Sequence, residues 1–434
     1  MQKLFNFFKK NPFILILALI LVFFTPQSLF APGENRERAI VIAIGLDKNE
    51  DEYEISFLTF IPTPNQEFKQ TNSVVSGIGS SISEALLDAQ LTLGKDIGLS
   101  HAKTTIVSEK MLENDISPSL DYLSRVVSLP ENTVFVCTNS SAKDLLKATS
   151  SLEENLGLKL DQLIYYNANE VYVSDTSLEA FYQGYYSEER ASIIGYLEYV
   201  EEENSQSQSA SGGASDVEGD SANQKDKASQ SLSSSQTEGT QGEEKERGSI
   251  NGQSQILNNG EAVLLKKGKK VAILNIDNLN SINLLNNKKS LDCIKINQVK
   301  TEDDKTVDMV FEVKNKYVNI ATKIQNKIPI FIADVNLGLK LTEIDTKGQE
   351  VKSNTQFTEI NQEIASKIES KIKIEFSQML QILRENKADV INVYDTFFRQ
   401  NRKQFLDFYN NLDDKEDYLN SIIFMLNVRL QPDG

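Results

Sequence analysis

Residues 201–249 set the strongest limit on how this chain can fold. The stretch SQSQSASGGASDVEGDSANQKDKASQSLSSSQTEGTQGEEKE within them contains almost no large apolar residue. Burial of apolar surface therefore cannot offset the entropy of ordering these residues, and we expect them to be disordered. They form either a linker between domains or a long surface loop. The folded parts of the chain must lie on the two sides of this segment.

The length and charge of the chain narrow the class of protein further. With 434 residues, it is long enough for two or three domains with separate cores. Hydrophobic residues make up 40% and charged residues 25%, which is typical of a globular protein. The 45 basic and 62 acidic residues give a formal net charge of −17. Such a surface repels nucleic acid at long range, so we expect no nucleic-acid function.

The N-terminus predicts a membrane segment. The run FILILALILVFFTPQSLFA at residues 13–31 follows a basic start, residues 1–12, that contains three lysines. Its nineteen residues are long enough to span a bilayer, although a cleaved secretory signal also fits this plan. We favour a retained anchor because the cleavage site is poor. The lysines place the N-terminus in the cytoplasm and the remaining chain outside.

Residues 35–200 predict a mixed α/β domain. The segment ERAIVIAIGLDKNEDEYEISFLTFIP holds two apolar runs joined at residues 47–52, which indicates a hairpin. Ser81 and Glu84 form a capping box ahead of an amphipathic helix. We then expect alternating strands and helices at residues 102–107, 118–127, 134–138 and 142–148, followed by a mostly helical stretch at 152–200.

The chain after the polar segment predicts two further units. Residues 250–325 are expected to form a strand-rich middle domain. Residues 328–434 are expected to form a C-terminal α+β domain, with a strand at DVNLGLKLTEID, a long helix from Ile360 to Leu383, a second helix at 390–409 and a final strand. The predicted fold class is therefore α+β: a multi-domain, mixed α/β ectodomain whose antiparallel sheets are packed by helices, preceded by one N-terminal transmembrane or signal segment.

Candidate reactive groups are few. The chain has one histidine, His101, and two cysteines, Cys137 and Cys293, so a multi-histidine metal site is impossible. We interpret His101 as structural, because a general base needs a nucleophile and an orienting carboxylate that no motif supplies. The cysteines lie in separate strand-like runs and favour two buried thiols over a disulfide.

Two other patterns also lack a complete motif. Gly77 and Gly79 in SGIGSSISEA precede a helix but complete no phosphate-binding spacing, so they predict a turn. The acidic stretches 49–54 and 412–419 do not match the spacing of an EF-hand and predict solvated loops. We therefore expect no catalytic, cofactor-binding or metal-binding residues, and no enzyme activity.

The order of several segments resembles one family, the Ger(x)C (GerAC-like) spore-germination proteins. The carrying segments are IAIGLDK at 42–48, SISEALLDA at 81–89, SHAKTTIVSE at 100–109 and NNGEAVLLKKGKKVAILN at 258–275. The long helix and closing strand are similar to the C-terminal domain of that family. The chain departs from the family pattern in two ways: no lipid-attachment cysteine follows the apolar run, and residues 201–249 form a long acidic insert.

The resemblance implies the C subunit of a nutrient germinant receptor. Such a subunit is not known as an enzyme. It lies on the outer face of the spore inner membrane and assembles with integral-membrane subunits of the A and B types. With no lipid, residues 13–31 would replace it as the tether. Two rival functions are an extracytoplasmic solute- or nutrient-binding protein and an envelope hydrolase that uses His101.

Overall fold

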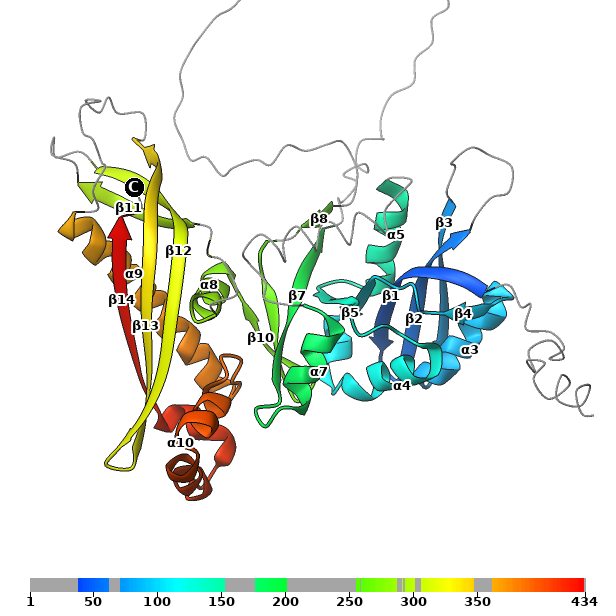
Figure 1. Ribbon diagram of the computed structural model, residues 1–434. Helices are drawn as coiled ribbons and strands as arrows, with labels where there is room; N and C mark the ends of the chain where they lie inside the picture. The colour runs from blue at the N-terminus through cyan, green and yellow to red at the C-terminus, as the bar shows by residue number, and fades with distance from the viewer. Residues whose placement is uncertain are drawn as a thin grey trace, which may run out of the picture.

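The computed structural model describes residues 38–61, 71–152, 176–200, 255–257, 259–286, 291, 293–300, 306–346 and 361–432. These residues form two β-sheets with helices packed against them (Figure 1). The predicted mixed α/β character is confirmed. The expected anchor at 13–31 and its basic start at 1–12 lie outside the described residues. Within the described residues, no helix combines the length and the apolar character that crossing a bilayer requires.

The larger sheet has the order β10-β9-β7-β6-β5-β1-β2-β3, with β4 paired to β1 and β8 to β7. Its strands are β1 (Arg38–Asn49), β2 (Glu52–Ile61), β3 (Thr71–Gly79), β4 (Asp96–Gly98), β5 (Thr104–Ser108), β6 (Val134–Thr138), β7 (Ala191–Val200), β8 (Gln255–Leu257), β9 (Ala262–Lys266) and β10 (Lys269–Leu274). The central strands β1, β5, β6 and β7 are parallel, and β2, β3, β9 and β10 extend the sheet in antiparallel pairs.

The expectation of purely antiparallel sheets is therefore wrong at the centre of this sheet. The connection between β5 and β6 contains a helix, which returns the chain to the same end of the sheet before the next strand begins. All five residues of β5 are buried, because helices cover both faces of the parallel region. An alternating pattern, which the sequence arguments relied on, is absent from such strands.

Helices lie on both faces of the larger sheet (Figure 1). One face packs against the helices α3 (Ile82–Leu93), η2 (Glu109–Glu113), α4 (Ser117–Val127) and α7 (Leu178–Tyr186). The opposite face packs against α5 (Ala142–Leu152), whose Leu145 and Leu146 contact Leu58 and Ile106 of the sheet. The expected helices at 81–93, 118–127 and 142–148 are all present.

The expectation of mostly helical structure at 152–200 is only partly correct. Helix α7 is present, but residues 191–200 form strand β7. The first seven residues of β7 are all buried, and a continuous apolar run of this kind does not distinguish a helix from a strand buried on both faces. The leucines expected to pack between residues 156 and 163 lie outside the described residues.

The second sheet has the order β11-β12-β13-β14, formed by β11 (Cys293–Lys300), β12 (Thr306–Gln325), β13 (Ile328–Asp345) and β14 (Ile423–Pro432). The pair β13–β14 is parallel. Its helices are α8 (Ile276–Leu284), α9 (Gln362–Glu385), α10 (Val393–Asn410) and η3 (Lys415–Ser421). The predicted apolar stripe of α9 is buried from Ile364 to Leu383, and it packs on the predicted inward face of β13. Ile360 lies outside the described residues.

The expected middle unit of residues 250–325 has no sheet of its own. Strands β9 and β10 join the larger sheet beside β7, whereas β11 and β12 belong to the second sheet. The boundary expected between residues 325 and 328 falls in the turn of the β12–β13 hairpin. Asn326 and Lys327 form this turn with φ of 51° and 70°, the geometry of the tightest hairpins. A lysine at such a position gives no turn signal in the sequence.

The polar segment connects neighbouring strands. Strand β7 ends at Val200, which pairs directly with Gln255 at the start of β8. Residues 201–249 themselves lie outside the described residues. Because the chain leaves and re-enters one sheet at paired positions, the segment is a loop within the larger sheet and not a linker between the two sheets.

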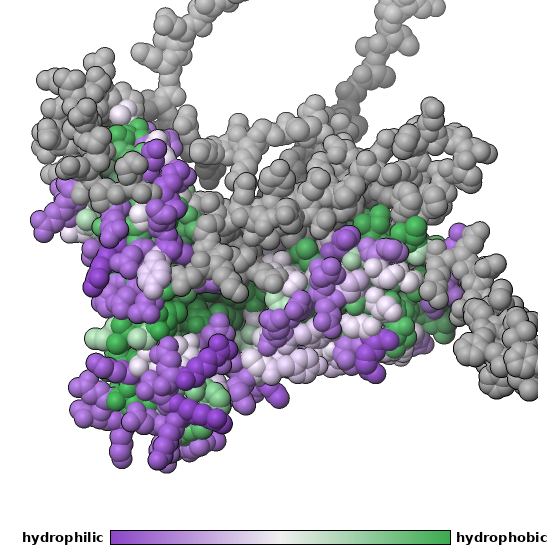
Figure 2. All heavy atoms as spheres, viewed as in Figure 1, coloured by the Kyte–Doolittle hydropathy of each residue, from purple (hydrophilic) through white to green (hydrophobic). Residues whose placement is uncertain are grey.

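The two sheets share a hydrophobic core. Ala191 and Ile193 of β7 and Ala262 and Leu264 of β9 belong to the same buried cluster as Phe331, Phe376, Phe397 and Phe405 of the C-terminal part. Hydrophobic residues line the hollow between the two parts in the space-filling view (Figure 2). An ion pair of 2.5 Å between Lys267 and Glu416 also joins them. The C-terminal part is therefore fixed to the larger sheet through side-chain packing.

Candidate functional site

The candidate site lies where the parallel strands of the larger sheet end. The carboxyl ends of β1, β5, β6 and β7 meet at one edge, the place where open α/β sheets commonly bind ligands. Asp47 stands near the end of β1, and Glu109 directly follows β5. Both residues belong to segments that carry the family resemblance. The contacts of Asp47 and Glu109 at this edge therefore indicate what these segments do.

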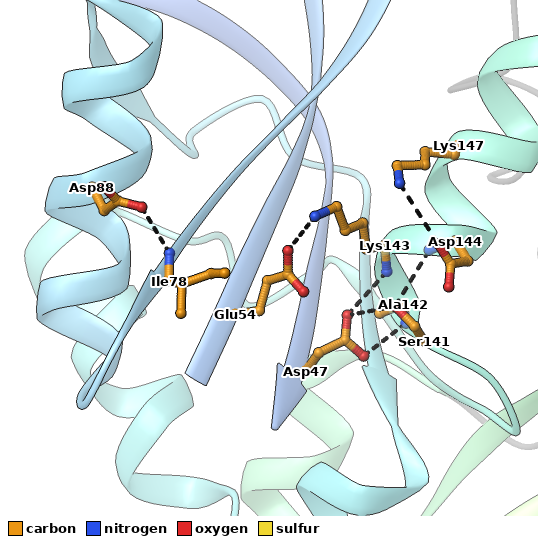
Figure 3. A network of polar contacts seen from close by, with 9 residues as sticks. All are labelled: Asp47, Glu54, Ile78, Asp88, Ser141, Ala142, Lys143, Asp144 and Lys147. Atoms are coloured by element: carbon orange, nitrogen blue, oxygen red, sulfur yellow. Dashed lines mark hydrogen bonds and ion pairs between the residues drawn. The ribbon is translucent and has the colours of Figure 1, made fainter. Parts of the chain in front are cut away.

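Asp47 holds the first turn of α5 in place. Its Oδ1 accepts a hydrogen bond from the Ala142 amide at 2.8 Å, and its Oδ2 accepts from the Lys143 amide at 3.0 Å and the Ser141 hydroxyl at 3.1 Å. Figure 3 shows these bonds converging on the carboxylate. A helix exposes unpaired amides at its start, and a carboxylate satisfies them. Asp47 therefore caps α5 from a different element of the sheet.

The neighbours of Asp47 strengthen this attachment. Burial raises the pKa of Asp47, against the opposing effect of the hydrogen bonds from the two amides. A Cβ atom on Gly45 would lie only 3.0 Å from the Leu146 side chain, so glycine allows α5 to approach β1 closely. Glu54 of β2 forms an ion pair with Lys143 (Figure 3). The segment IAIGLDK thus serves to attach α5.

The glycines of SGIGSSISEA have a related role. They lie in β3 and not in a turn as predicted. A Cβ atom on Gly77 would lie 2.3 Å from both the Ala85 oxygen and the Ala89 nitrogen, so only glycine permits this contact between β3 and α3. Asp88 of α3 also accepts a hydrogen bond from the Ile78 amide at 2.9 Å (Figure 3).

The capping box is present in altered form. The Ser81 hydroxyl accepts from the Glu84 amide at 3.2 Å, as predicted. The Glu84 carboxylate accepts from the amide and hydroxyl of Ser80 instead of from the amide of Ser81. Those bonds lower the pKa of Glu84. The predicted helix start is confirmed.

His101 is exposed in the turn before β5. Glu109 lies at the other end of the segment SHAKTTIVSE, directly after β5. It connects β5 with β7 and β10. Its carboxylate accepts from the Tyr196 hydroxyl of β7 at 2.7 Å and pairs with Lys270 of β10 at 2.6 Å. Burial alone raises the pKa of Glu109, but the bonds from Lys270 and Tyr196 outweigh it and leave the pKa below its usual value.

Replacing Glu109 with glutamine is expected to lower the free energy of unfolding by about 1 kcal/mol at pH 7, allowing for the partial exposure of the pair. Because the folded-state pKa is lowered, the contribution of the carboxylate is present above its unfolded pKa of about 4.3 and is lost as the pH falls through the folded value. Urea unfolding at pH 7 and pH 3.5 measures both effects. A loss of equal size at the two pH values contradicts the assignment.

Two carboxylates of the second acidic stretch are also engaged in ion pairs. Within the stretch 412–419, Asp414 pairs with Lys387 at 2.5 Å and Glu416 pairs with Lys267. Among the described residues, no group of three or more histidine, cysteine or acidic side chains is placed to hold a metal ion. The two acidic stretches therefore contribute to the attachment of neighbouring elements.

The two cysteines do not form a disulfide. Cys137 is buried in β6, and burial raises the pKa of its thiol well above the usual value. Cys293, at the start of β11, is exposed, so the expectation of two buried thiols is correct for Cys137 alone. A buried thiol of raised pKa is a poor nucleophile.

Sequence reasoning found the segments but missed the role of Asp47. It assigned this residue to the connection of a hairpin, whereas the β1–β2 turn lies three residues later, at Glu50 and Asp51. The serine before α5 was the available signal for the start of that helix, because serine is a preferred N-cap residue. The carboxylates of the site accept hydrogen bonds from the protein itself. Their role in this arrangement is therefore to stabilise the fold.

Two family models match the chain in consecutive regions. Residues 34–199 match the model described as the spore germination protein N-terminal domain. Residues 259–429 match the model described as spore germination B3/GerAC like, C-terminal. These regions lie on the two sides of the polar segment and contain most of the two sheets.

Two individual proteins are also similar to this chain. The protein called "Putative spore germination protein YfkR" from Bacillus subtilis (strain 168) is 27% identical over 132 residues, which are 28% of this chain and 34% of that protein. The chain thus matches about a third of the length of this relative. The solved structure titled "Crystal Structure of the GerBC protein" has a TM-score of 0.46 at 14% identity, covering 92% of this chain and 100% of that chain. The two family matches together show that the chain belongs to the GerAC-like family of spore germination proteins.

Proposed function

We propose that this protein is the non-catalytic C subunit of a nutrient germinant receptor and acts through assembly with integral-membrane subunits of the A and B types. The main support is the use of the carboxylates at the candidate site. Asp47 is bonded to the start of α5, and Glu109 is bonded to β7 and β10, so both carboxylates hold elements of the protein together. Such a site builds a stable surface for contact with partners.

The tether of the protein is part of this proposal. The apolar run at residues 13–31 follows Lys3, Lys9 and Lys10 and is not followed by a cysteine for lipid attachment. We therefore place the N-terminus in the cytoplasm and the folded parts on the outer face of the spore inner membrane. Intact mass and N-terminal sequencing of the membrane-bound protein distinguish a retained anchor from a cleaved signal.

An exposed apolar face of α3 is the surface we assign to a partner subunit. Leu87 and Leu91 lie one helical turn apart and are 55% and 73% exposed. Val126 on α4 is 54% exposed on the same side of the sheet as α3. Exposed large apolar side chains that recur on one face are typical of protein contacts.

The double variant Leu87→Ser/Leu91→Ser is expected to lose co-purification with the integral-membrane subunits from spore membranes, by about tenfold or more, while keeping its circular dichroism spectrum. Ile374→Ser is the matched control, because Ile374 is 58% exposed on α9 in the other part of the molecule. Germination in response to nutrients should fail with the double variant alone. Normal co-purification and germination of the double variant would contradict this assignment.

A cavity beside α9 favours the alternative of a solute-binding protein. It has a volume of about 230 Å³ and is lined by Asp277 and Ser281 of α8, Lys371 and Glu375 of α9, and Asn280. The Asn280 Oδ1 atom is buried without a hydrogen-bond partner. Titration of the purified protein with amino acids and sugars tests this alternative, and saturable binding lost in Lys371→Met would support it.

A further inference from the structure

A second cavity lies where the two parts of the molecule face each other. It has a volume of about 250 Å³. Its walls come from α7 and the start of β7 on one side and from the connection between α9 and α10 on the other, and its polar lining consists of Gln183, Ser187, Glu189, Ser192, Asp389 and Asn392. All residues that line it belong to the described part of the chain.

Glu189 gives this cavity an unusual property. The residue is only 8% exposed, and its Oε1 atom is buried without a hydrogen-bond partner. An ionised carboxylate in such a place is costly unless a donor or a cation reaches it. Burial and the nearby Asp389 raise the pKa of Glu189. The Oε1 atom can therefore still accept a hydrogen bond from a donor on a ligand.

Asp389 is the second carboxylate of the cavity and is itself well bonded. It is 3% exposed and accepts hydrogen bonds from the Ile391 amide at 3.1 Å, the Tyr394 amide at 2.9 Å and the Tyr418 hydroxyl. These donors lie in the segment leading into α10, in its first turn and in η3. Their hydrogen bonds oppose the effect of burial, which raises the pKa of Asp389.

The charges around the cavity do not balance. Lys266 is the partly buried cation next to it, and its Nζ donates to the Glu189 carbonyl oxygen at 2.6 Å instead of to the carboxylate. Lys267 is paired with Glu416, and Glu188 and Arg190 are both exposed. When Glu189 and Asp389 are both ionised, they and Lys266 together leave one negative charge without a counterpart.

We propose that this cavity binds one primary ammonium group, with Glu189 Oε1 as its principal acceptor and Asp389 supplying the second negative charge. An ammonium group carries three donors and one positive charge, which matches one unpartnered carboxylate oxygen and the uncompensated charge. The Ser192 hydroxyl in the lining is a neutral acceptor. The described residues around the cavity do not form a metal-binding group of three or more ligands.

Such a ligand would link the two parts of the molecule, because Glu189 belongs to the larger sheet and Asp389 to the C-terminal part. Occupancy would stabilise their present arrangement through differential binding. The inference does not depend on the proposed receptor function, since it rests on groups that lie within this chain alone.

The test is thermal unfolding of the purified full-length chain, followed by circular dichroism at pH 7 and constant ionic strength. Ammonium chloride and methylammonium chloride each replace sodium chloride in one series, with tetramethylammonium chloride as the cation that lacks donors. We expect a saturable rise in Tm of about 2 °C with ammonium at tenfold its Kd, and none with tetramethylammonium. A rise with methylammonium as well shows that an amine of a larger molecule can enter, and a rise with ammonium alone identifies the free ion.

Two variants complete the test. Glu189→Gln should abolish the ammonium-dependent rise whatever its own Tm, because it removes the charge that holds the ligand. Glu188→Gln, which changes an exposed neighbour, should retain the rise. The proposal is overturned by the absence of any rise in the wild type, by an equal rise with potassium chloride, or by an undiminished rise in Glu189→Gln.

Discussion

Replacing Gly77 with alanine is expected to lower the free energy of unfolding by about 3 kcal/mol or more. The added Cβ would lie 2.3 Å from the Ala85 oxygen and the Ala89 nitrogen, which are backbone atoms of α3. A flexible side chain could turn aside, but a helix backbone cannot. Because Ala85 and Ala89 are fully buried, moving α3 away would open the core beneath it.

The same substitution at Gly94 is the matched control. Gly94 ends α3 with a φ of 67°, and a Cβ atom there would meet no atom within 4 Å. Gly94→Ala should therefore cost only the left-handed strain of about 1 kcal/mol. Urea unfolding monitored by circular dichroism compares the two variants. Equal losses would show that the contact between β3 and α3 does not require glycine at position 77.

Replacing Asp47 with alanine is expected to cost about 2 kcal/mol, the second large effect. The change removes three hydrogen bonds at once and leaves the Ala142 and Lys143 amides without their acceptor. Since α5 contacts β1, β2, β3 and β5, loosening its first turn should expose the core beneath that helix. Hydrogen exchange of the α5 amides should rise more than exchange of the α4 amides, and the midpoint of urea unfolding should fall.

The control for Asp47 is Asp144→Ala in the same helix. Asp144 is partly exposed and pairs with Lys147 at 3.7 Å, a surface contact (Figure 3). We expect a change within about 0.5 kcal/mol. If Asp144→Ala destabilises the protein as much as Asp47→Ala does, the capping role of Asp47 is wrong.

Local sequence signals predicted most of the individual elements. The capping serine at position 81 marked the start of α3, and the three- and four-residue spacing of apolar residues from Ile364 to Leu383 marked α9. The alternation of Val335, Leu337 and Leu339 identified the buried face of β13. Each of these signals depends on neighbours within one or two turns, which a single sequence contains.

Long-range pairing was not predictable in the same way. Nothing in AVLLK or KKVAIL indicates that β9 pairs with β7, which precedes it by more than 60 residues in the chain. The β12–β13 turn has lysine where glycine would have given a signal. Strand β7 resembled a helix because both of its faces are buried. These pairings distribute the strands of the expected middle unit, residues 250–325, over the two sheets.

The sequence identified the segments that contain the candidate site but not the contacts of its residues. Gly77, Gly79 and His101 were recognised from the sequence, but the partners of the two glycines lie on α3, at distances only the folded chain defines. The charge imbalance at Glu189 and Asp389 joins positions 200 residues apart, and no local pattern connects them. Electrostatic relations between distant segments require the structure.

Because Val200 pairs with Gln255, the chain between these two residues is a suitable place to divide the protein. A cut at any peptide bond between these residues would yield two fragments. The second fragment would carry β9 and β10, which complete the sheet of the first, together with most of the shared core. Separately produced fragments should therefore complement each other into one particle, and a reporter domain inserted there should leave both parts assembled.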